Sequence, residues 1–291
     1  MSIELRSRYV LANGVRTHYS EVGGNGLAIL ALHGGGAGSS GAAGMGLLME
    51  KLGDAYRVVA PDSIGGFGDT DPYAPAPHGL FSRVAHTADV IDALCLPKVT
   101  LLGNSQGAWV AAQYAILNPD RVEKIILVSS VTIAASLGIQ QRRTPAHAAL
   151  NDYDGSREGM RRILDALIID RSRITDALIA ERQAAATRPG AFEAFKAFGA
   201  AVARLRTHPL YALQNDMTKT LPALTKAIPT IFIWGENDIF AIPEVGRQLE
   251  KLLPDVKFHW VKNAGHQVQT DQPEIVAEII SGAPARVPAG V

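Results

Sequence analysis

The chain has 291 residues, of which 47% are hydrophobic and 19% charged, and its 28 Lys and Arg residues balance 28 Asp and Glu residues. This profile is typical of one large α/β domain with an insertion or of two smaller globular domains. The zero net charge gives no electrostatic reason to expect binding to nucleic acid or to a membrane, and no apolar run is long enough to span a bilayer.

The cysteine content and the N-terminus bear on the cellular compartment. The single cysteine, Cys95, excludes an intrachain disulfide framework and a cysteine-rich metal site. It lies in an apolar stretch with helical spacing, which favours a packed core thiol over a reactive one. The first eight residues lack the apolar core of a signal peptide. We therefore expect a cytoplasmic protein.

The N-terminal part of the chain alternates strand and helix patterns. Residues 5–12 and 15–21 alternate like two strands around Asn13-Gly14, a strong signal for a two-residue hairpin turn. Residues 27–32 form a continuous apolar run, which is typical of a strand covered on both faces. The same reasoning predicts three further elements, a helix near 42–52, a strand over 57–61 and a helix near 81–95.

The next stretch predicts a nucleophile elbow. A short buried strand, Lys98–Leu102, leads into Gly-Asn-Ser-Gln-Gly over 103–107, and a nearly all-apolar helix follows until Asn118-Pro119. G-x-S-x-G between a strand and a helix places the serine hydroxyl, here that of Ser105, on a sharp exposed turn. The two glycines leave room for the strand and the helix to approach. The alternative is a chance match in a glycine-rich protein.

The remainder of the chain completes an α/β pattern with one interruption. Strand patterns occur at 122–129, 229–234 and 256–262, and helix patterns at 243–252 and 273–281. Between 136 and 215 no strand is evident, and the stretch is helical and rich in arginine. We therefore predict a mostly parallel central sheet with helices on both faces and an inserted helical lid. The predicted core is 1–135 and 216–281, the lid is 136–215, and 282–291 is a mobile tail.

Two loops at predicted strand ends can activate Ser105. A serine needs a base to take its proton and a third group to hold that base. In this topology the partners follow in the order Ser, acid, His. Asp238, after strand 229–234, is the predicted acid, with Glu236 in reserve. His266, after the last strand, is the predicted base.

The same reasoning predicts an oxyanion hole from two backbone N–H groups. One is that of Gln106, directly after the nucleophile. The other comes from the H-G-G-G segment after strand 27–32, with Gly36 as the expected donor and Gly35 as the alternative. The side chain of His33 is expected to pack under this loop. A rival interpretation reads G-x-G-x-x-G over 36–41, with Asp62 further on, as a dinucleotide fingerprint. It leaves the predicted triad unexplained.

These residues together resemble an α/β-hydrolase. More narrowly, the chain is similar to the meta-cleavage product hydrolases, serine enzymes that cleave a carbon–carbon bond in products of aromatic ring fission. The resemblance covers residues 10–281 and is carried by four places, namely His33–Gly38, the Asn before the nucleophile in 103–107, the segment Ile174–Arg182 and Gly265-His266.

The resemblance implies substrate-binding residues. It implies that Arg182 holds the carboxylate and dienolate of the substrate, which a planar guanidinium can do bidentately; the alternative is an arginine on a solvated helix face. Asn104 either binds the substrate or braces the elbow. Gln267 stands where the family usually has Trp, and residues 42–45 lack the family's Asn. Gly35 and Gln267 are counted with Asn104 and Arg182 as predicted substrate-binding residues.

The resulting hypothesis is a serine hydrolase that needs no cofactor or metal and cleaves a C–C bond of a 2-hydroxy-6-oxo-2,4-dienoate. The resemblance also implies a homo-oligomer, a dimer or larger. The alternatives are a carboxylesterase or lactonase on the same triad, an NAD(P)-binding oxidoreductase and a non-catalytic ligand receptor.

Overall fold

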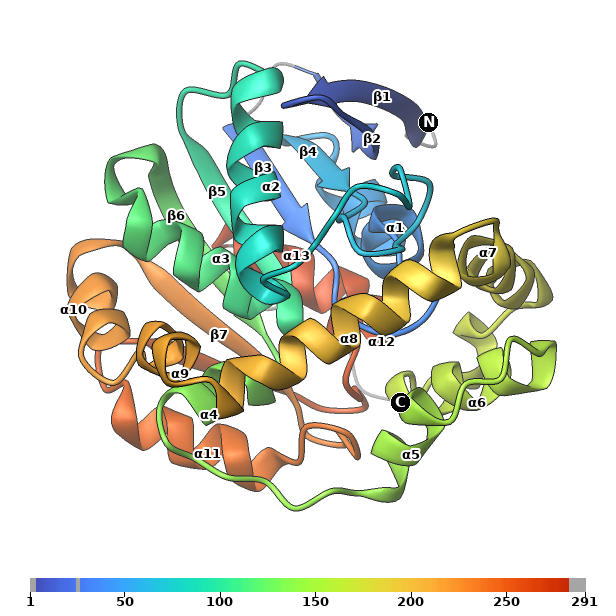
Figure 1. Ribbon diagram of the computed structural model, residues 1–291. Coiled ribbons are helices and arrows are strands. Elements are labelled where there is room, and N and C mark those ends of the chain that lie inside the picture. Colours follow the sequence, from blue (N-terminus) through green and yellow to red (C-terminus); the bar gives the residue numbers. More distant parts are fainter. Residues whose placement is uncertain (1–3, 25–26, 283–291) are drawn as a thin grey trace, which may run out of the picture.

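A computed structural model describes residues 4–24 and 27–282 of the chain (Figure 1). An eight-stranded sheet with the order β1-β2-β4-β3-β5-β6-β7-β8 runs through its centre. β2 pairs antiparallel with β1 and β4, and all other neighbours are parallel, so the predicted sheet is confirmed. The strands are β1 (Arg6–Ala12), β2 (Val15–Val22), β3 (Leu27–Leu32), β4 (Tyr56–Pro61), β5 (Val99–Asn104), β6 (Val122–Val128), β7 (Thr230–Gly235) and β8 (Lys257–Val261).

Helices cover both faces of this sheet, as the apolar strands require, because a strand such as β5 that is buried along its whole length needs a cover on each side. One face packs on α1 (Gly41–Leu52), α12 (Val268–Asp271) and α13 (Pro273–Ser281). The other packs on α2 (Leu80–Ala93), α3 (Gln106–Leu117), α4 (Val131–Ser136), α10 (Thr220–Ala227) and α11 (Pro243–Leu252).

The carboxyl ends of the parallel strands meet at one edge of the sheet. The register places Asn104 of β5 beside Val128 of β6, and Val128 beside Ile233 of β7. Gly235, the last residue of β7, pairs with Val261 of β8. The loops that follow β3, β5, β7 and β8 therefore start from neighbouring positions, although they lie far apart along the chain.

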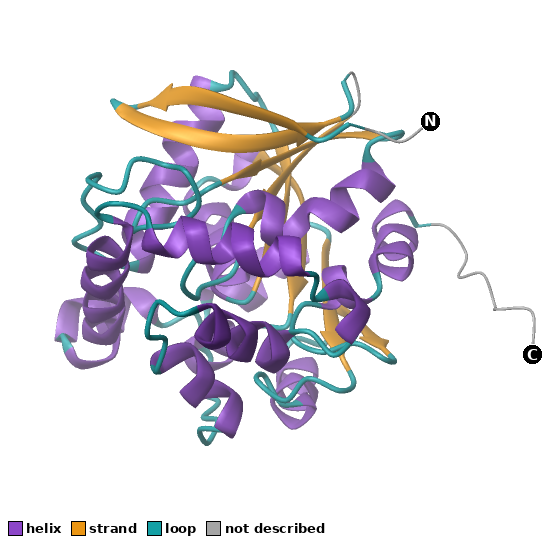
Figure 2. Cartoon of the chain, turned by 90° about the vertical axis from the view of Figure 1, so that its right-hand side faces the viewer, coloured by secondary structure: helices purple, strands orange, loops and turns teal. Residues whose placement is uncertain are grey.

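Between β6 and β7 the structure contains no strand, in agreement with the sequence pattern over 136–215. We call the helices between α4 and α10 the insertion. Figures 1 and 2 show most of it on the side of the molecule away from the β1–β2 pair, although its helix over 176–187 lies beside α1. A small apolar core of its own includes Met160, Leu164 and Ile179. The insertion comprises α5 (Pro145–Asn151), α6 (Arg157–Leu167), α7 (Asp176–Thr187), α8 (Ala191–Thr207) and α9 (Pro209–Asn215).

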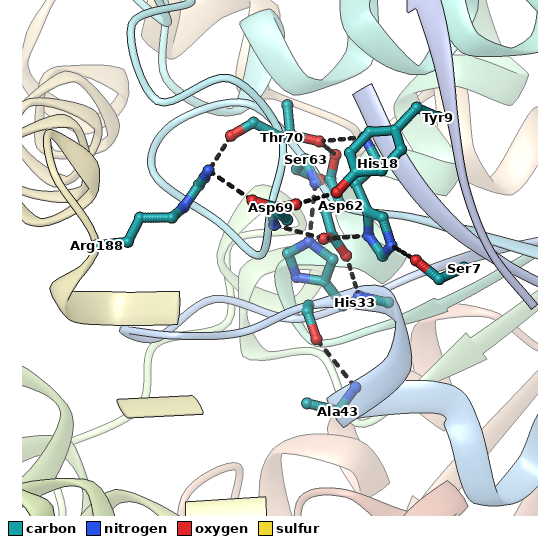
Figure 3. Close-up of polar contacts among 12 residues, drawn as sticks. Ser7, Tyr9, His18, His33, Ala43, Asp62, Ser63, Asp69, Thr70 and Arg188 are labelled. Carbon is teal, nitrogen blue, oxygen red and sulfur yellow. Dashed lines mark hydrogen bonds and ion pairs between the residues drawn. The ribbon is translucent and has the colours of Figure 1, made fainter. Parts of the chain in front are cut away.

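A polar network, the edge cluster of Ser7, His18, Asp62, Asp69 and Arg188, ties the first strands to α1 and to the insertion (Figure 3). The buried Asp62 carboxylate accepts the N–H of Gly41 at 2.6 Å and the N–H of Asp69 at 2.8 Å, while His18 Nδ1 lies 2.8 Å from its Oδ2. Arg188, just after α7, donates to the Asp69 carboxylate at 3.0 Å. The loop from 62 to 70 is thereby fixed on both sides.

Two expectations need comment. The prediction of a packed thiol at Cys95 is wrong: the residue is exposed, with a φ of 51° in the turn that follows α2, because the helix ends before the apolar stretch does. The predicted mobile tail lies outside the described residues except for Gly282. Among the described residues, no helix has the length and apolar character needed to cross a membrane.

Candidate active site

Ser105 occupies a strained turn between β5 and α3. Its φ of 57° and ψ of −117° form a backbone conformation that residues other than glycine rarely adopt. This conformation costs about 1–2 kcal/mol of stability. Two hydrogen bonds hold the turn: the Ser105 N–H donates to the Val128 carbonyl at 2.8 Å, and the Ser130 hydroxyl donates to the Ser105 carbonyl at 2.7 Å. The Ser105 N–H is therefore held by β6 and its carbonyl by the N-cap residue of α4.

The two glycines of the elbow have no room for a side chain. A Cβ on Gly103 would lie 2.3 Å from the carbonyl oxygen of Gly107, and a Cβ on Gly107 would lie 2.1 Å from that of Leu32. Both are backbone atoms that cannot swing away. The expected close approach of strand and helix is confirmed, and it brings α3 against the end of β3.

His266 and Asp238 form a buried pair. His266 Nδ1 lies 2.9 Å from Asp238 Oδ2, and the two residues are 3% and 2% exposed. The other oxygen, Asp238 Oδ1, accepts the N–H groups of Phe240 at 2.8 Å and Ala241 at 2.7 Å. The carboxylate can only accept, so Nδ1 carries the hydrogen and Nε2 is left as the basic nitrogen. Glu236, the reserve candidate, is exposed.

A cavity of about 260 Å³ connects these groups. Ser105 and His266 both line it. The described contacts include no hydrogen bond between the Ser105 hydroxyl and His266, a contact that is often long in unliganded sites and shortens with substrate. Asn104 holds the two loops together by donating to the His266 carbonyl at 3.0 Å. The other lining residues include Gly34, Gly35, Gly36, Gln106, His147, Leu150, Leu167, Phe195, Phe198, Val202, Phe240 and Gln267.

Two backbone N–H groups are available beside Ser105. Those of Gly36 and Gln106 donate no hydrogen bond among the described residues, and both residues line the cavity. Gly36 has a φ of 112°, a conformation that L side chains rarely adopt. Gly35 contacts the Gln106 side chain so closely that a Cβ there would lie 2.5 Å from its Oε1. The glycine loop and the start of α3 therefore meet as an oxyanion hole requires.

A family model described as the alpha/beta hydrolase family matches residues 29–279. This chain belongs to the α/β hydrolase family. The glycine-rich segment 36–41 is thus part of a hydrolase loop rather than a dinucleotide fingerprint, and Asp62, its supposed acidic partner, instead accepts the N–H of Gly41 at 2.6 Å.

Named relatives narrow the similarity. The hydrolase is 32% identical to 2-hydroxy-6-oxo-2,4-heptadienoate hydrolase from Pseudomonas putida, over 91% of each chain. It is 29% identical to 2-hydroxymuconate semialdehyde hydrolase from a Pseudomonas species, over 94% of this chain and 92% of that one. Among solved structures it is similar to the meta-cleavage product hydrolase from Pseudomonas fluorescens complexed with acetates, with a TM-score of 0.75, 29% identity and coverage of 95% and 98%.

The loop histidine of this hydrolase, His33, is structural, as expected. Nδ1 donates to the Gly34 carbonyl at 2.7 Å and Nε2 accepts the Ser63 N–H at 3.1 Å, a contact visible in Figure 3. Burial, with help from the nearby Arg83 charge, lowers the pKa of His33 well below its usual value. A neutral ring with both nitrogens engaged fixes the start of the glycine loop.

Sequence reasoning missed Arg83, on the buried side of α2. Its guanidinium donates to the His33 carbonyl at 2.7 Å and to Gln106 Oε1 at 3.3 Å, so it connects the two halves of the candidate oxyanion hole. Burial lowers its pKa to about 9. The only signal was its place next to Val84 on the predicted apolar face of the helix.

Arg182 does not line the cavity, in contrast to what the resemblance implies. It is 1% exposed, and Nη2 donates to the Ala37 carbonyl at 3.2 Å and to Ser39 Oγ at 3.0 Å. It lies directly behind Gly36, where a Cβ would be 3.7 Å from Nη2. The alternative of a solvated helix face is also wrong. Burial lowers the pKa of Arg182 to about 10.

The other predicted substrate-binding residues, Asn104, Gly35 and Gln267, all line the cavity. The Asn104 amide braces the elbow by donating to the carbonyls of Val128 at 3.3 Å and His266 at 3.0 Å. Gln267 is the N-cap residue of α12, and its Oε1 accepts the Thr270 hydroxyl at 3.0 Å. Sequence reasoning missed His147 and Phe240 as cavity residues; the short distance of Phe240 from Asp238 along the chain was the one available signal.

Proposed function

We propose that this hydrolase cleaves the C5–C6 bond of a 2-hydroxy-6-oxo-2,4-dienoate, with Ser105, His266 and Asp238 as its triad and the N–H groups of Gly36 and Gln106 as its oxyanion hole. One observation carries the proposal. Ser105 on its strained elbow and His266, which is paired with the buried Asp238, line the same 260 Å³ cavity. Two residues whose backbone N–H groups have no acceptor among the described residues line it as well. The names of the relatives supply the substrate class.

The charges around the cavity support an anionic substrate. Arg83 and Arg182 are both buried beside the glycine loop, and neither forms an ion pair within the described part of the chain. A buried cation without an ion-pair partner favours a nearby anion. The dienoate carries a carboxylate and a C2 oxygen, whereas a simple ester is neutral. This observation favours C–C hydrolysis over the carboxylesterase or lactonase alternative.

The reaction begins with ketonisation. The C2 hydroxyl loses its proton and C5 gains one, which leaves a 2,6-dioxo compound with a saturated C5. The positive region behind Gly36 stabilises the C2 oxygen and the carboxylate. Arg182 acts on the carboxylate through this field, or directly if its guanidinium leaves Ala37 and Ser39. Asn104, directly before Ser105, also lines the cavity.

Cleavage then follows the logic of acyl transfer. His266 Nε2 takes the proton of the attacking oxygen, that of Ser105 or of a water molecule, while Asp238 stabilises the resulting imidazolium. The oxygen adds to C6, and the two N–H groups stabilise the oxyanion. When the C5–C6 bond breaks, its electron pair moves through C4 and C3 to the C2 oxygen, which is protonated. The first product is 2-hydroxypenta-2,4-dienoate. The carboxylic acid forms directly when water attacks; when Ser105 attacks, a water activated by His266 hydrolyses the acyl-serine to the acid and restores the hydroxyl.

A paired assay tests this function. The hydrolase is given 2-hydroxy-6-oxo-2,4-heptadienoate, whose yellow colour bleaches on cleavage, and p-nitrophenyl acetate. We expect kcat/KM for the dienoate to exceed that for the ester at least about 100-fold, and acetate to be released in equal amount to the dienol acid. Ester hydrolysis without bleaching would show that the chain is an esterase. Rapid quenching with mass spectrometry shows whether Ser105 carries the acetyl group.

Three further predictions belong to this proposal. The insertion acts as a lid, because it supplies His147, Leu150, Phe195 and Phe198 to the cavity wall. The homo-oligomeric state and the cytoplasmic location stay predictions. Light scattering on the purified chain tests the first of these two, and fractionation of the source cells tests the second.

A further inference from the structure

One cavity residue, His147, has no part in the proposed mechanism. It lies on α5 of the insertion and faces the cavity together with Leu150. The cavity wall includes the apolar Phe195, Phe198 and Val202 of α8 as well as polar residues such as Asn151 of α5. The ring is half-buried, and one of its two nitrogens is used at the start of α5.

The helix cap fixes which nitrogen of His147 carries the hydrogen. His147 is the third residue of α5, and the backbone N–H of Thr144 donates to its Nδ1 at 3.1 Å. The Thr144 hydroxyl lies 2.9 Å from the same atom. A backbone N–H can only donate, so Nδ1 is an acceptor and the hydrogen of the neutral ring is on Nε2. Nε2 has no hydrogen-bond partner among the described residues.

Aromatic contacts fix where this donor lies. The His147 ring stacks on Phe240 with a centroid distance of 4.3 Å and an interplanar angle of 20°. Phe240 in turn contacts the ring of His266 with a centroid distance of 4.6 Å. Burial lowers the pKa of His147, with smaller contributions from the charges of His266 and Arg143, so the ring is a neutral donor held one aromatic layer from the triad.

The charges of the cavity indicate which end of the substrate meets His147. The buried guanidinium of Arg182, which has no ion-pair partner among the described residues, lies behind Gly36: a Cβ on Gly36 would lie 3.7 Å from its Nη2. The carboxylate and C2 oxygen belong at that end for the electrostatic reason given above. With C6 at Ser105, the C6 substituent then extends toward His147, Phe240 and the apolar residues of α8.

On the basis of the proposed function, we propose that His147 is a specificity residue whose Nε2–H donates a hydrogen bond to an acceptor oxygen in the C6 substituent. The hydrolase then prefers dienoates whose C6 group carries an ether, hydroxyl or carbonyl oxygen over those with a purely alkyl group of the same size. A substrate with no acceptor covers the half-buried Nε2–H of His147 without pairing it, which costs binding.

The test compares two isosteric substrates that differ in one position, the dienoates with a C6 methoxymethyl and a C6 propyl group. The measured quantity is the ratio of their kcat/KM values and the change in that ratio on substitution, so differences in intrinsic reactivity cancel. In H147F, which keeps a ring against Phe240 but loses the donor, we expect the ratio to fall about 3- to 10-fold, as for one neutral hydrogen bond. An unchanged ratio in a folded H147F overturns the proposal.

Two control variants separate specificity from helix capping. In H147Q the side-chain oxygen can still accept the Thr144 N–H and the amide can still donate into the cavity, so the ratio should stay within about twofold of the wild-type value. T144A weakens the start of α5 but keeps His147, and should leave the ratio unchanged. A ratio that falls equally in T144A and H147F shows a structural effect and overturns the proposal.

The outcome is also separable from the proposed function. If the wild-type chain cleaves neither dienoate, C–C hydrolysis is wrong. The p-nitrophenyl esters of methoxyacetic and butyric acid place the same two groups on the acyl side, so their kcat/KM ratio in wild type and H147F then tests the donor role of His147 independently.

Discussion

Within residues 4–24 and 27–282, two Ser-His-Asp groups can be compared, and only one of them has the surroundings of an active site. In the edge cluster, Ser7 Oγ lies 2.8 Å from His18 Nε2, and His18 Nδ1 lies 2.8 Å from Asp62 Oδ2 (Figure 3). This chain of hydrogen bonds is complete. At the carboxyl edge of the sheet only the His266–Asp238 contact is formed.

The backbone explains the difference between the two groups. Ser7 lies in the extended strand β1, paired with Ser20, and is exposed. Ser105 sits at a φ of 57° in front of the N-terminus of α3, with undonated N–H groups beside it and a cavity above it. A serine becomes useful where a developing oxyanion can be stabilised. A Ser-His-Asp series of hydrogen bonds alone does not stabilise an oxyanion. In the edge cluster the series instead fixes the loop 62–70.

The serines provide the largest contrast. We expect Ser105→Ala to lower kcat by about 10⁴-fold or more, because both the nucleophile and its hydrogen bond to the base are lost. Ser7→Ala should leave kcat and KM within about twofold, because its hydroxyl faces no oxyanion donors. Both variants are measured with the dienoate assay after circular dichroism confirms folding. A large loss in S7A would mean that the edge cluster takes part in turnover.

The carboxylates sharpen the comparison, because the same substitution should have opposite consequences. Asp238→Asn should lower kcat by about 10⁴-fold with little loss of stability, since the amide favours the wrong histidine tautomer. Asp62→Asn should lower the free energy of unfolding by about 2–4 kcal/mol, because one of the donors from Gly41, Asp69 and His18 then meets an NH₂ group.

Chemical denaturation and steady-state kinetics on both aspartate variants separate the two effects. Folded D62N should retain near wild-type kcat. If D62N is as stable as the wild type, the edge cluster does not hold the loop 62–70; if D238N retains its activity, another carboxylate orients His266.

What could be predicted from the sequence follows the same division. The succession of strands and helices along the chain, the elbow and the triad candidates were predictable, because each rests on a local pattern. These patterns are an apolar run followed by glycines, and an acid or a histidine at a strand end. The cavity position of Phe240 and the donor role of Arg83 depend on which helix face meets which loop, and no local pattern encodes that.

Arg182 illustrates the limit most clearly. The resemblance identified it as the arginine of the insertion that matters, and it is indeed buried near the site. Its side chain, however, donates to the Ala37 carbonyl and the Ser39 hydroxyl, so it meets the glycine loop from behind and does not enter the cavity. The edge cluster was likewise invisible, since Ser7, His18 and Asp62 come from three separate segments with no shared motif.

The smallest expected effect is a pH dependence of stability that belongs to the edge cluster. Burial lowers the pKa of His18, but the hydrogen bond and charge of Asp62, with a contribution from Asp69 and against Arg16, outweigh burial and raise it. A raised folded-state pKa means that the stabilisation is fully present below the unfolded value of about 6.5 and is lost as the pH rises through the folded value.

We therefore expect wild type to exceed His18→Gln in free energy of unfolding most at about pH 5.5, with a smaller difference at about pH 8.5. Urea denaturation of both proteins at the two pH values measures this. H259Q is the matched control, because burial lowers the pKa of His259: a neutral histidine is favoured there, so its contribution should grow with pH. A difference for H18Q that grows from low to high pH would show that the neutral form of His18 is the one that binds Asp62, and that the edge cluster is not an ion pair.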